Sequence, residues 1–149
     1  DQLLIELAAV RSDGSKVVFT NGCFDMLHAG HVQMLDEAKD LGDYLIVGLN
    51  SDDSVRRLKG ESRPVNTAAD RARVLGALRS VDAVVTFGED TPERLLNAIK
   101  PDVLVKGGDY GPDEVVGREI VEAEGGRVVV VGHTRGKSTT DLLERVRGS

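Results

Sequence analysis

The chain has 149 residues, 40% of them hydrophobic and 30% charged, with a net charge of −6 at pH 7 and a single cysteine, Cys23. This composition indicates one globular domain with a substantial core. It argues against broad nucleic-acid binding, and no apolar run reaches the roughly 18 residues of a membrane helix. One cysteine allows no disulfide within the chain, so we expect a cytoplasmic domain. The charge and the absence of a long apolar run lead us to expect neither membrane nor nucleic-acid partners.

The apolar runs of the chain predict five strands. They are short, rich in valine and isoleucine, and hydrophobic nearly throughout, which is typical of strands covered on both faces. They occupy residues 16–21, 43–50, 82–87, 102–107 and 127–132.

Helical patterns separate these runs. Thr91 before Pro92 predicts one helix start, with Thr91 as the N-cap. Strand–helix alternation predicts an α/β fold, a single Rossmann-like doubly wound domain with a five-stranded parallel sheet and helices on both faces. We assign residues 1–15 to an N-terminal helix and connector and residues 16–149 to this domain. The predicted helices are 1–10, 29–41, 67–80, 91–99, 112–125 and 139–147.

The segment "NGCFDMLHAGH", residues 21–31, follows the first strand and opens the first long helix. In doubly wound sheets, ligands bind beyond the carboxyl ends of the strands. Free N–H groups at a helix start, with the helix dipole, form a natural phosphate site. His28 and His31 are three residues apart and are expected to share a face, so both rings could donate to phosphate oxygens.

Two other interpretations of these histidines are open. One is structural, with one ring capping the helix and the other packed beneath the loop. The other is a metal site, but the pair lacks a cysteine and a clearly placed third ligand, which makes a weak case for zinc. The pattern H-x-G-H after a strand, preceded by G-x-F-D, favours a functional role.

The stretch "GCFDMLHAGH" resembles the G-x-F-D-x-x-H-x-G-H signature of the cytidylyltransferase-like nucleotidyltransferases. Later blocks, among them "LGDYLIVGLNSDDSVRRLKGESRPVN", "PDVLVKGGDY" and "GKSTTDLLERV", resemble the adenylyltransferase domain that acts on heptose 1-phosphate. The resemblance spans roughly residues 16–146. It contains no kinase segment, so we expect the stand-alone or excised transferase.

The resemblance implies a set of site residues. It implies that His28 and His31 stabilise the α-phosphate and that Lys59 and Arg71 contact the triphosphate; these four are the predicted catalytic residues. The predicted substrate-binding residues are Asp25, Arg63 and Arg79, although Asp25 could equally stabilise the turn. The predicted nucleotide-binding residues are Asn21, Gly22, Cys23, Phe24, Gly30, His31, Lys59, Gly107, Asp109, Ser138, Thr139 and Thr140.

The basic residues gather in the middle of the chain. Residues 52–79 hold seven arginines and lysines against four acids, a charge of +3 in a chain of −6. The simplest interpretation is a solvated face with i, i+4 ion pairs, which covers part of the set. A triphosphate would need the remainder.

Two later segments also follow predicted strands. In "VKGGDY", residues 105–110, glycines permit close backbone approach to a ligand; the resemblance places this turn at the base and ribose, and Asp109 could hold a sugar hydroxyl or cap a helix. "GHTRGKS", residues 132–138, is one residue short of a Walker A loop, so we interpret it as a helix start that offers hydroxyl and N–H groups to phosphates. Whether His133, Arg135 or Lys137 supplies positive charge there is open.

Together these features predict transfer of AMP from ATP to a heptose 1-phosphate, releasing pyrophosphate. Mg²⁺ is expected to arrive with ATP, and no side-chain metal site is assigned. The alternatives are a cytidylyltransferase acting on glycerol 3-phosphate or another phosphorylated acceptor, and a nucleotide-binding module without turnover. A homodimer is expected from the resemblance alone.

Overall fold

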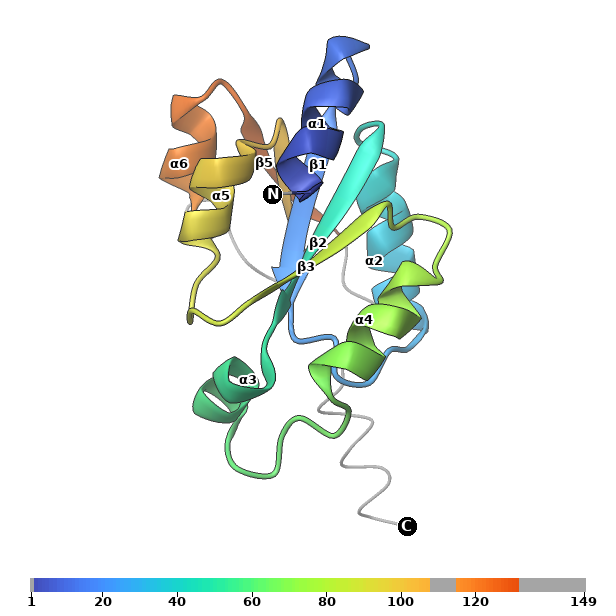
Figure 1. Ribbon diagram of the computed structural model, residues 1–149, viewed down its shortest axis with the longest axis vertical. Helices are drawn as coiled ribbons and strands as arrows, with labels where there is room; N and C mark the ends of the chain where they lie inside the picture. Colours follow the sequence, from blue (N-terminus) through green and yellow to red (C-terminus); the bar gives the residue numbers. More distant parts are fainter. Residues whose placement is uncertain (1, 108–114, 132–149) are drawn as a thin grey trace.

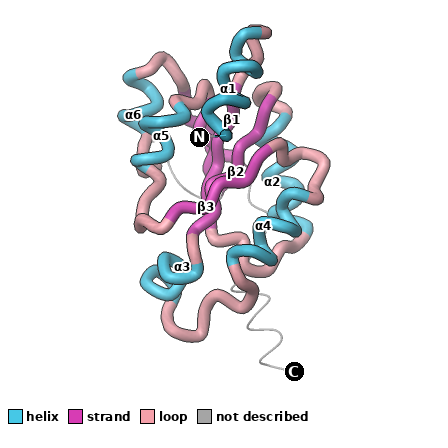
Figure 2. The backbone as a smooth tube through the Cα atoms, in the orientation of Figure 1, coloured by secondary structure: helices cyan, strands magenta, loops and turns pink. Residues whose placement is uncertain are grey.

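The computed structural model describes residues 2–107 and 115–131, which form a five-stranded parallel sheet with helices on both faces (Figures 1 and 2). The strand order is β3-β2-β1-β4-β5. The predicted α/β architecture is therefore confirmed. The strands are β1 (Val17–Gly22), β2 (Tyr44–Asn50), β3 (Ala83–Phe87), β4 (Val103–Gly107) and β5 (Arg127–Val131).

The helices cover the sheet in two layers (Figure 1). One face carries α1 (Gln2–Ser12), α5 (Glu93–Ile99) and α6 (Arg118–Ala123). The opposite face carries α2 (Ala29–Lys39) and α4 (Ala68–Gly76). A further helix, α3 (Asp52–Lys59), lies beyond the carboxyl end of β2.

Alternate residues of each strand enter two separate cores. In β1, Phe19 packs on the α1/α5/α6 face and Val18 packs on the α2/α4 face, and both are fully buried. In β4, Leu104 and Val105 divide in the same way. The strands are thus apolar on both sides, which is why their sequences read as nearly continuous hydrophobic runs.

Three helix predictions need correction. The helix α3 was not predicted, because its only buried apolar residue is Val55; Ser51 caps it by accepting a hydrogen bond from the Ser54 N–H. Helix α6 begins at Arg118 rather than at residue 112, after Gly117 at φ +94°. Thr91 is not the N-cap of α5: Pro92 occupies that position. The predicted helix at 139–147 lies outside the described residues.

The direction of winding reverses at β1. The chain proceeds from β1 to β2 and β3 on one side and reaches β4 and β5 on the other. The carboxyl ends of β1 and β4 therefore flank the switch point, where ligands bind in folds of this type. We call this end of the sheet the carboxyl edge. Within the described ranges, no helix is long and apolar enough to cross a membrane.

Candidate active site

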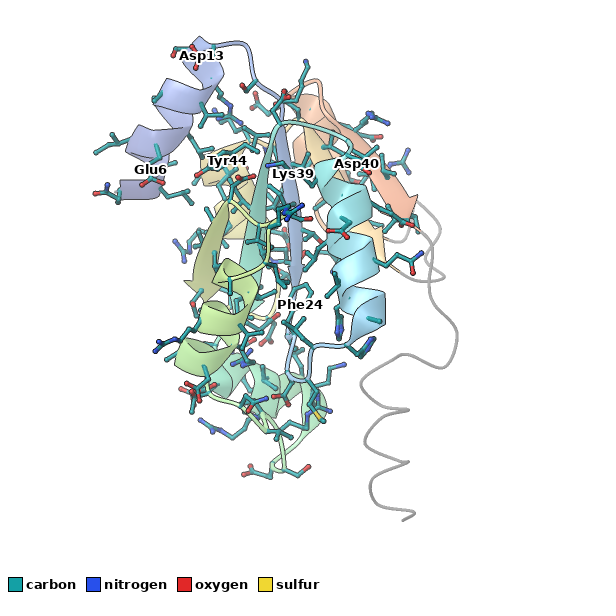
Figure 3. All side chains as sticks on the ribbon, turned by 90° about the vertical axis from the view of Figure 1, so that its right-hand side faces the viewer. Glu6, Asp13, Phe24, Lys39, Asp40 and Tyr44 are labelled. Carbon is teal, nitrogen blue, oxygen red and sulfur yellow. The ribbon has the colours of Figure 1, made fainter. Side chains whose placement is uncertain are left out.

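The loop after β1 is built around a strained aromatic residue. Phe24 has φ +46°, an unusual value for a residue with a side chain, and is 6% exposed. Figure 3 shows it between α2 and α4. Its ring meets His31 edge-on at a centroid distance of 5.5 Å. A Cβ atom at Gly22 would lie 3.1 Å from the same ring, so the preceding glycine allows the loop to close over it.

His28 and His31 form a reciprocal cap at the start of α2. His28 is the N-cap, with extended backbone, and its Nδ1 accepts a hydrogen bond from the Gly30 N–H at 3.1 Å. His31, three residues on, accepts one from the His28 N–H through its own Nδ1 at 3.3 Å. The two rings lie 3.9 Å apart at 31°. The predicted pairing of the histidines is therefore present, although only His31 is inside the helix.

This cap determines the chemistry of the rings. Because each Nδ1 accepts a hydrogen bond, each neutral ring carries its proton on Nε2, which makes Nε2–H a donor. Burial, together with the neighbouring His28, lowers the pKa of His31 to about 4. His31 is therefore a neutral donor near pH 7. Two such donors beside a helix N-terminus provide a preorganised site for phosphate oxygens.

Asp25 holds two loops together. Its side chain is fully buried and accepts hydrogen bonds from the backbone N–H groups of Val65 and Asn66, at 2.7 and 2.8 Å, and from Arg63 Nε at 2.6 Å. Burial by itself would raise the pKa of Asp25, but the hydrogen bonds from Asn66, Val65 and Arg63 outweigh it and hold that pKa below its usual value. Of the two roles considered for Asp25, the geometry supports stabilisation of the loop.

Arg71 lies at the centre of the same network and is buried, with an exposed fraction of 2%. Its guanidinium donates to the carbonyls of Asn66 at 3.0 Å, Cys23 at 2.7 Å and Asn50 at 2.8 Å. It also pairs with Asp52 Oδ1 at 2.7 Å. The network joins the loop after β1, the end of β2 and the start of α4. Contact between Arg71 and a triphosphate stays a prediction, because in this arrangement its donors serve the protein.

The exposed cations of the basic segment differ in their ion pairing. Arg56 and Arg57 make exposed ion pairs with Asp53 and Asp90, which agrees with a solvated face, although neither pair has the i, i+4 spacing. Lys59 is exposed at the last turn of α3, with no ion pair among the residues that the structure describes. With Arg73 and Arg79, it is one of the exposed cations of this segment that an anionic ligand could meet.

Cys23 lies between the loops of this site. Burial raises the pKa of its thiol, against the opposing effect of Lys59, Arg71 and Arg63. The thiol is therefore neutral near pH 7. Lys59, although far from this loop in sequence, is thus among the charges that act on the pKa of Cys23.

The ends of β1 and β4 carry further polar groups, of which the sequence prediction included Asn21 but neither Thr20 nor Lys106. Asn21 Oδ1 and Thr20 Oγ1 are buried and have no hydrogen-bond partner among the described residues. Lys106 is half-buried at the end of β4, and desolvation lowers its pKa, partly opposed by Cys23. The position of Lys106 one residue before Gly107, at the end of a predicted strand, was the available signal.

Arg79 lies at the opposite end of the sheet from the histidines. It precedes β3, and its neighbour Asp82 pairs with Lys39, which Figure 3 shows at the far end of α2 from Phe24. Within one chain, Arg79 is thus separated from the carboxyl edge, and its predicted contact with substrate stays a prediction. Four other predicted residues lie outside the described residues: Asp109, Ser138, Thr139 and Thr140.

No group of three or more metal-binding side chains occurs in residues 2–107 and 115–131. This part of the chain therefore offers no protein cage for a divalent ion.

Gly107 approaches α2 closely, because a Cβ atom there would lie 3.0 Å from Met34 Cγ. The end of β4 is consequently held against the helix that begins at the histidines.

A model of the cytidylyltransferase-like family matches residues 19–145. The chain is 58% identical over 147 residues to the bifunctional protein HldE of Ectopseudomonas mendocina, covering 99% of this chain and 31% of that protein. It is 57% identical to the bifunctional protein HldE of Pelobacter propionicus, covering 98% and 30%. The chain thus spans about a third of the length of these curated relatives.

A solved structure has the same fold over nearly its whole length. The lipopolysaccharide core biosynthesis protein of Thermoplasma volcanium superposes with a TM-score of 0.67 and is 29% identical, covering 81% of this chain and 98% of that one.

Proposed function

The chain belongs to the cytidylyltransferase-like family, and on that premise we propose that it transfers AMP from ATP to a heptose 1-phosphate. A phosphate oxygen of the acceptor attacks the α-phosphorus. The new P–O bond forms as the bond to the bridging oxygen breaks, and pyrophosphate leaves with that electron pair. The products are ADP-heptose and pyrophosphate.

The observation that carries this proposal is the histidine cap at the start of α2. Both Nδ1 atoms accept backbone hydrogen bonds, so both Nε2–H groups are donors. As the α-phosphate becomes five-coordinate, charge grows on its oxygens, and fixed donors stabilise that charge without reorganising. Phosphoryl-type transfer depends mainly on positioning and on such charge stabilisation.

The remaining predicted residues divide between binding and positioning. Lys59 contacts the β- and γ-phosphates. Its exposure and the effect of its charge on the pKa of Cys23 support this assignment. Arg71 and Asp25 position the loops on which the donors lie, supported by their burial and their hydrogen bonds. Mg²⁺ would come bound to the phosphates of ATP, where it would neutralise phosphate charge.

The heptose acceptor is supported by the sequence blocks after the first loop and by the relatives named HldE. It is tested by pyrophosphate release from ATP or CTP, each combined with D-glycero-β-D-manno-heptose 1-phosphate or glycerol 3-phosphate. We expect release only with ATP and the heptose phosphate.

The other outcomes separate the alternatives. Release with CTP and glycerol 3-phosphate would replace this proposal with the cytidylyltransferase. Nucleotide binding without pyrophosphate release from any pair would indicate a binding module. A variant with His28 and His31 both changed to alanine provides the background rate.

A further inference from the structure

Lys106 is a partly buried cation at the carboxyl edge that the proposed chemistry does not yet use. It lies on β4, one residue before Gly107, and pairs in register with Val130 of β5. No ion pair to Lys106 is formed by the residues that the structure describes, which include the end of β1 beside it. Desolvation lowers the pKa of Lys106, and Cys23 opposes this effect only in part.

The strand register places Lys106 and Asn21 on the same face of the sheet. Phe19 of β1 is paired with Leu104 of β4, and both enter the core on the α1/α5/α6 face. Two residues further along each strand, Asn21 and Lys106 point to that same face, because side chains alternate with a period of two. A Cβ atom at Gly48 of β2 would lie 3.3 Å from Asn21 Cβ, which confirms the direction of Asn21.

Asn21 is a second, independent sign of an unfilled polar site. Its Oδ1 is buried, and residues 2–107 and 115–131 offer it no hydrogen-bond partner. A buried acceptor without a donor costs free energy, and so does a desolvated ammonium without an anion. A ligand carrying both a phosphate and hydroxyl donors satisfies both groups, because phosphate pairs with the ammonium and a hydroxyl donates to the amide oxygen.

The histidines lie on the other face of the sheet. They begin α2, which packs on the α2/α4 face. In an in-line displacement the attacking and leaving groups occupy opposite sides of the phosphorus. Because the histidines serve the oxygens of the α-phosphate, a cation on the opposite face is available to a second anionic group, either the acceptor phosphate or the leaving pyrophosphate, and the buried amide oxygen of Asn21 favours the acceptor, which also carries hydroxyl donors.

We propose that Lys106, with Asn21 on the same face of the sheet, binds the acceptor, with the ammonium on its phosphate and the amide oxygen on a sugar hydroxyl. This inference rests on the proposed function for the identity of the acceptor. It assigns Lys106 a role in acceptor affinity and leaves the nucleotide to the histidines and Lys59.

The test is the effect of Lys106→Met on the two KM values. Methionine keeps an unbranched stem and removes the charge. We expect KM for heptose 1-phosphate to rise about 10- to 100-fold, the loss typical of a charge-assisted hydrogen bond, and KM for ATP to change less than about 2-fold. Lys106→Arg should recover part of the acceptor affinity. Lys16→Met, an exposed site at the amino end of β1, is the matched control.

Thermal unfolding distinguishes a binding role of Lys106 from a structural one. Removing an unpaired, desolvated charge should leave Tm unchanged or raise it. An unchanged acceptor KM in folded Lys106→Met would overturn the proposal. An equal rise in both KM values would overturn it too, because Lys106 would then contact the nucleotide.

A different outcome separates this inference from the proposed function. If the wild type releases no pyrophosphate with any acceptor, the function fails, and Lys106 is tested with inorganic phosphate in the presence of a non-hydrolysable ATP analogue. We then expect phosphate to shift the NMR signal of the Lys106 ε-methylene group, identified by its loss in Lys106→Met. No shift at millimolar phosphate would exclude an anion site.

Discussion

Two groups of polar residues meet at the carboxyl edge, and they differ in how far the protein itself satisfies them. In the first, which we call the closed network, Asp25 and Arg71 hold Arg63, Asn66 and Asp52 by short hydrogen bonds. In the second, the open group, Asn21 Oδ1 has no hydrogen-bond partner and Lys106 no ion pair among the described residues, and His31 presents Nε2–H. Polar and charged residues at the same edge therefore have opposite roles. Those of the closed network hold the loops together, and those of the open group are left for a ligand.

This difference separates residues that shape the site from residues that meet a ligand. A buried carboxylate or guanidinium with all its partners in the protein has little left to offer a substrate. A buried polar group that lacks partners is costly unless a ligand supplies them. Substitutions in one group at a time, from the largest expected effect to the smallest, test this separation.

Asp25→Asn should give the largest change, in the closed network. It leaves the Arg63 charge without its partner in a site where the carboxylate is fully buried and Arg63 is 11% exposed. We expect the free energy of unfolding, measured by urea titration, to fall by about 3–5 kcal/mol, as when a buried ion pair is broken. Asp53→Asn, at an exposed ion pair, is the control and should change it by less than about 0.5 kcal/mol. Equal effects would show that the network is not structural.

His31→Asn should give the next largest change, in the open group. Asparagine can reach the position of Nδ1, which caps His28, but not that of Nε2. We therefore expect the turnover rate to fall about 10²–10³-fold, with Tm close to that of the wild type. His31→Gln, which can place an amide donor nearer Nε2, should be less impaired. A folded His31→Asn with near wild-type turnover would remove the proposed histidine role.

The stability of the protein should depend on pH through His31. Its pKa is lowered from 6.5 to about 4 on folding, so the unfolded chain takes up this proton first as pH falls. The stability that depends on a neutral His31 is fully present above pH 6.5 and is lost progressively as the pH falls from 6.5 to 4. Urea unfolding of His31→Asn should show a flatter dependence over that range. Parallel curves for variant and wild type would contradict the prediction.

Arg79→Ala should give the smallest change. Arg79 is exposed and lies away from the carboxyl edge of its own chain. We expect both KM values and kcat to stay within about 2-fold of the wild type, since exposed substitutions away from a site usually have small effects. A loss of 10-fold or more would indicate that a second chain brings Arg79 to the site, and measuring the variant's oligomeric state would test that.

Much of the fold was predictable because its signals are local. Valine-rich runs such as 127–132 and 43–50 indicate buried parallel strands wherever they occur, and the observed β5 and β2 lie within these ranges. The helix α3 was missed for the converse reason: it buries one apolar residue, Val55, and extends past the sheet. Its existence depends on its Ser51 cap and charged ends more than on a hydrophobic stripe.

By itself, the sequence determined the sheet, the position of its carboxyl edge and the pairing of His28 with His31. Each of these follows from residues adjacent or nearly adjacent in the chain. Only the tertiary structure decided which charges face a ligand. The partners of Arg71 come from three places in the chain, at Cys23, at Asn50 and Asp52, and at Asn66, and Lys106 shares a face with Asn21 only because β1 and β4 are paired. Whether a charged residue binds a ligand or supports the fold depends on which partners the fold brings to it. A hydrogen-bonding group already satisfied by the protein has little left for a ligand.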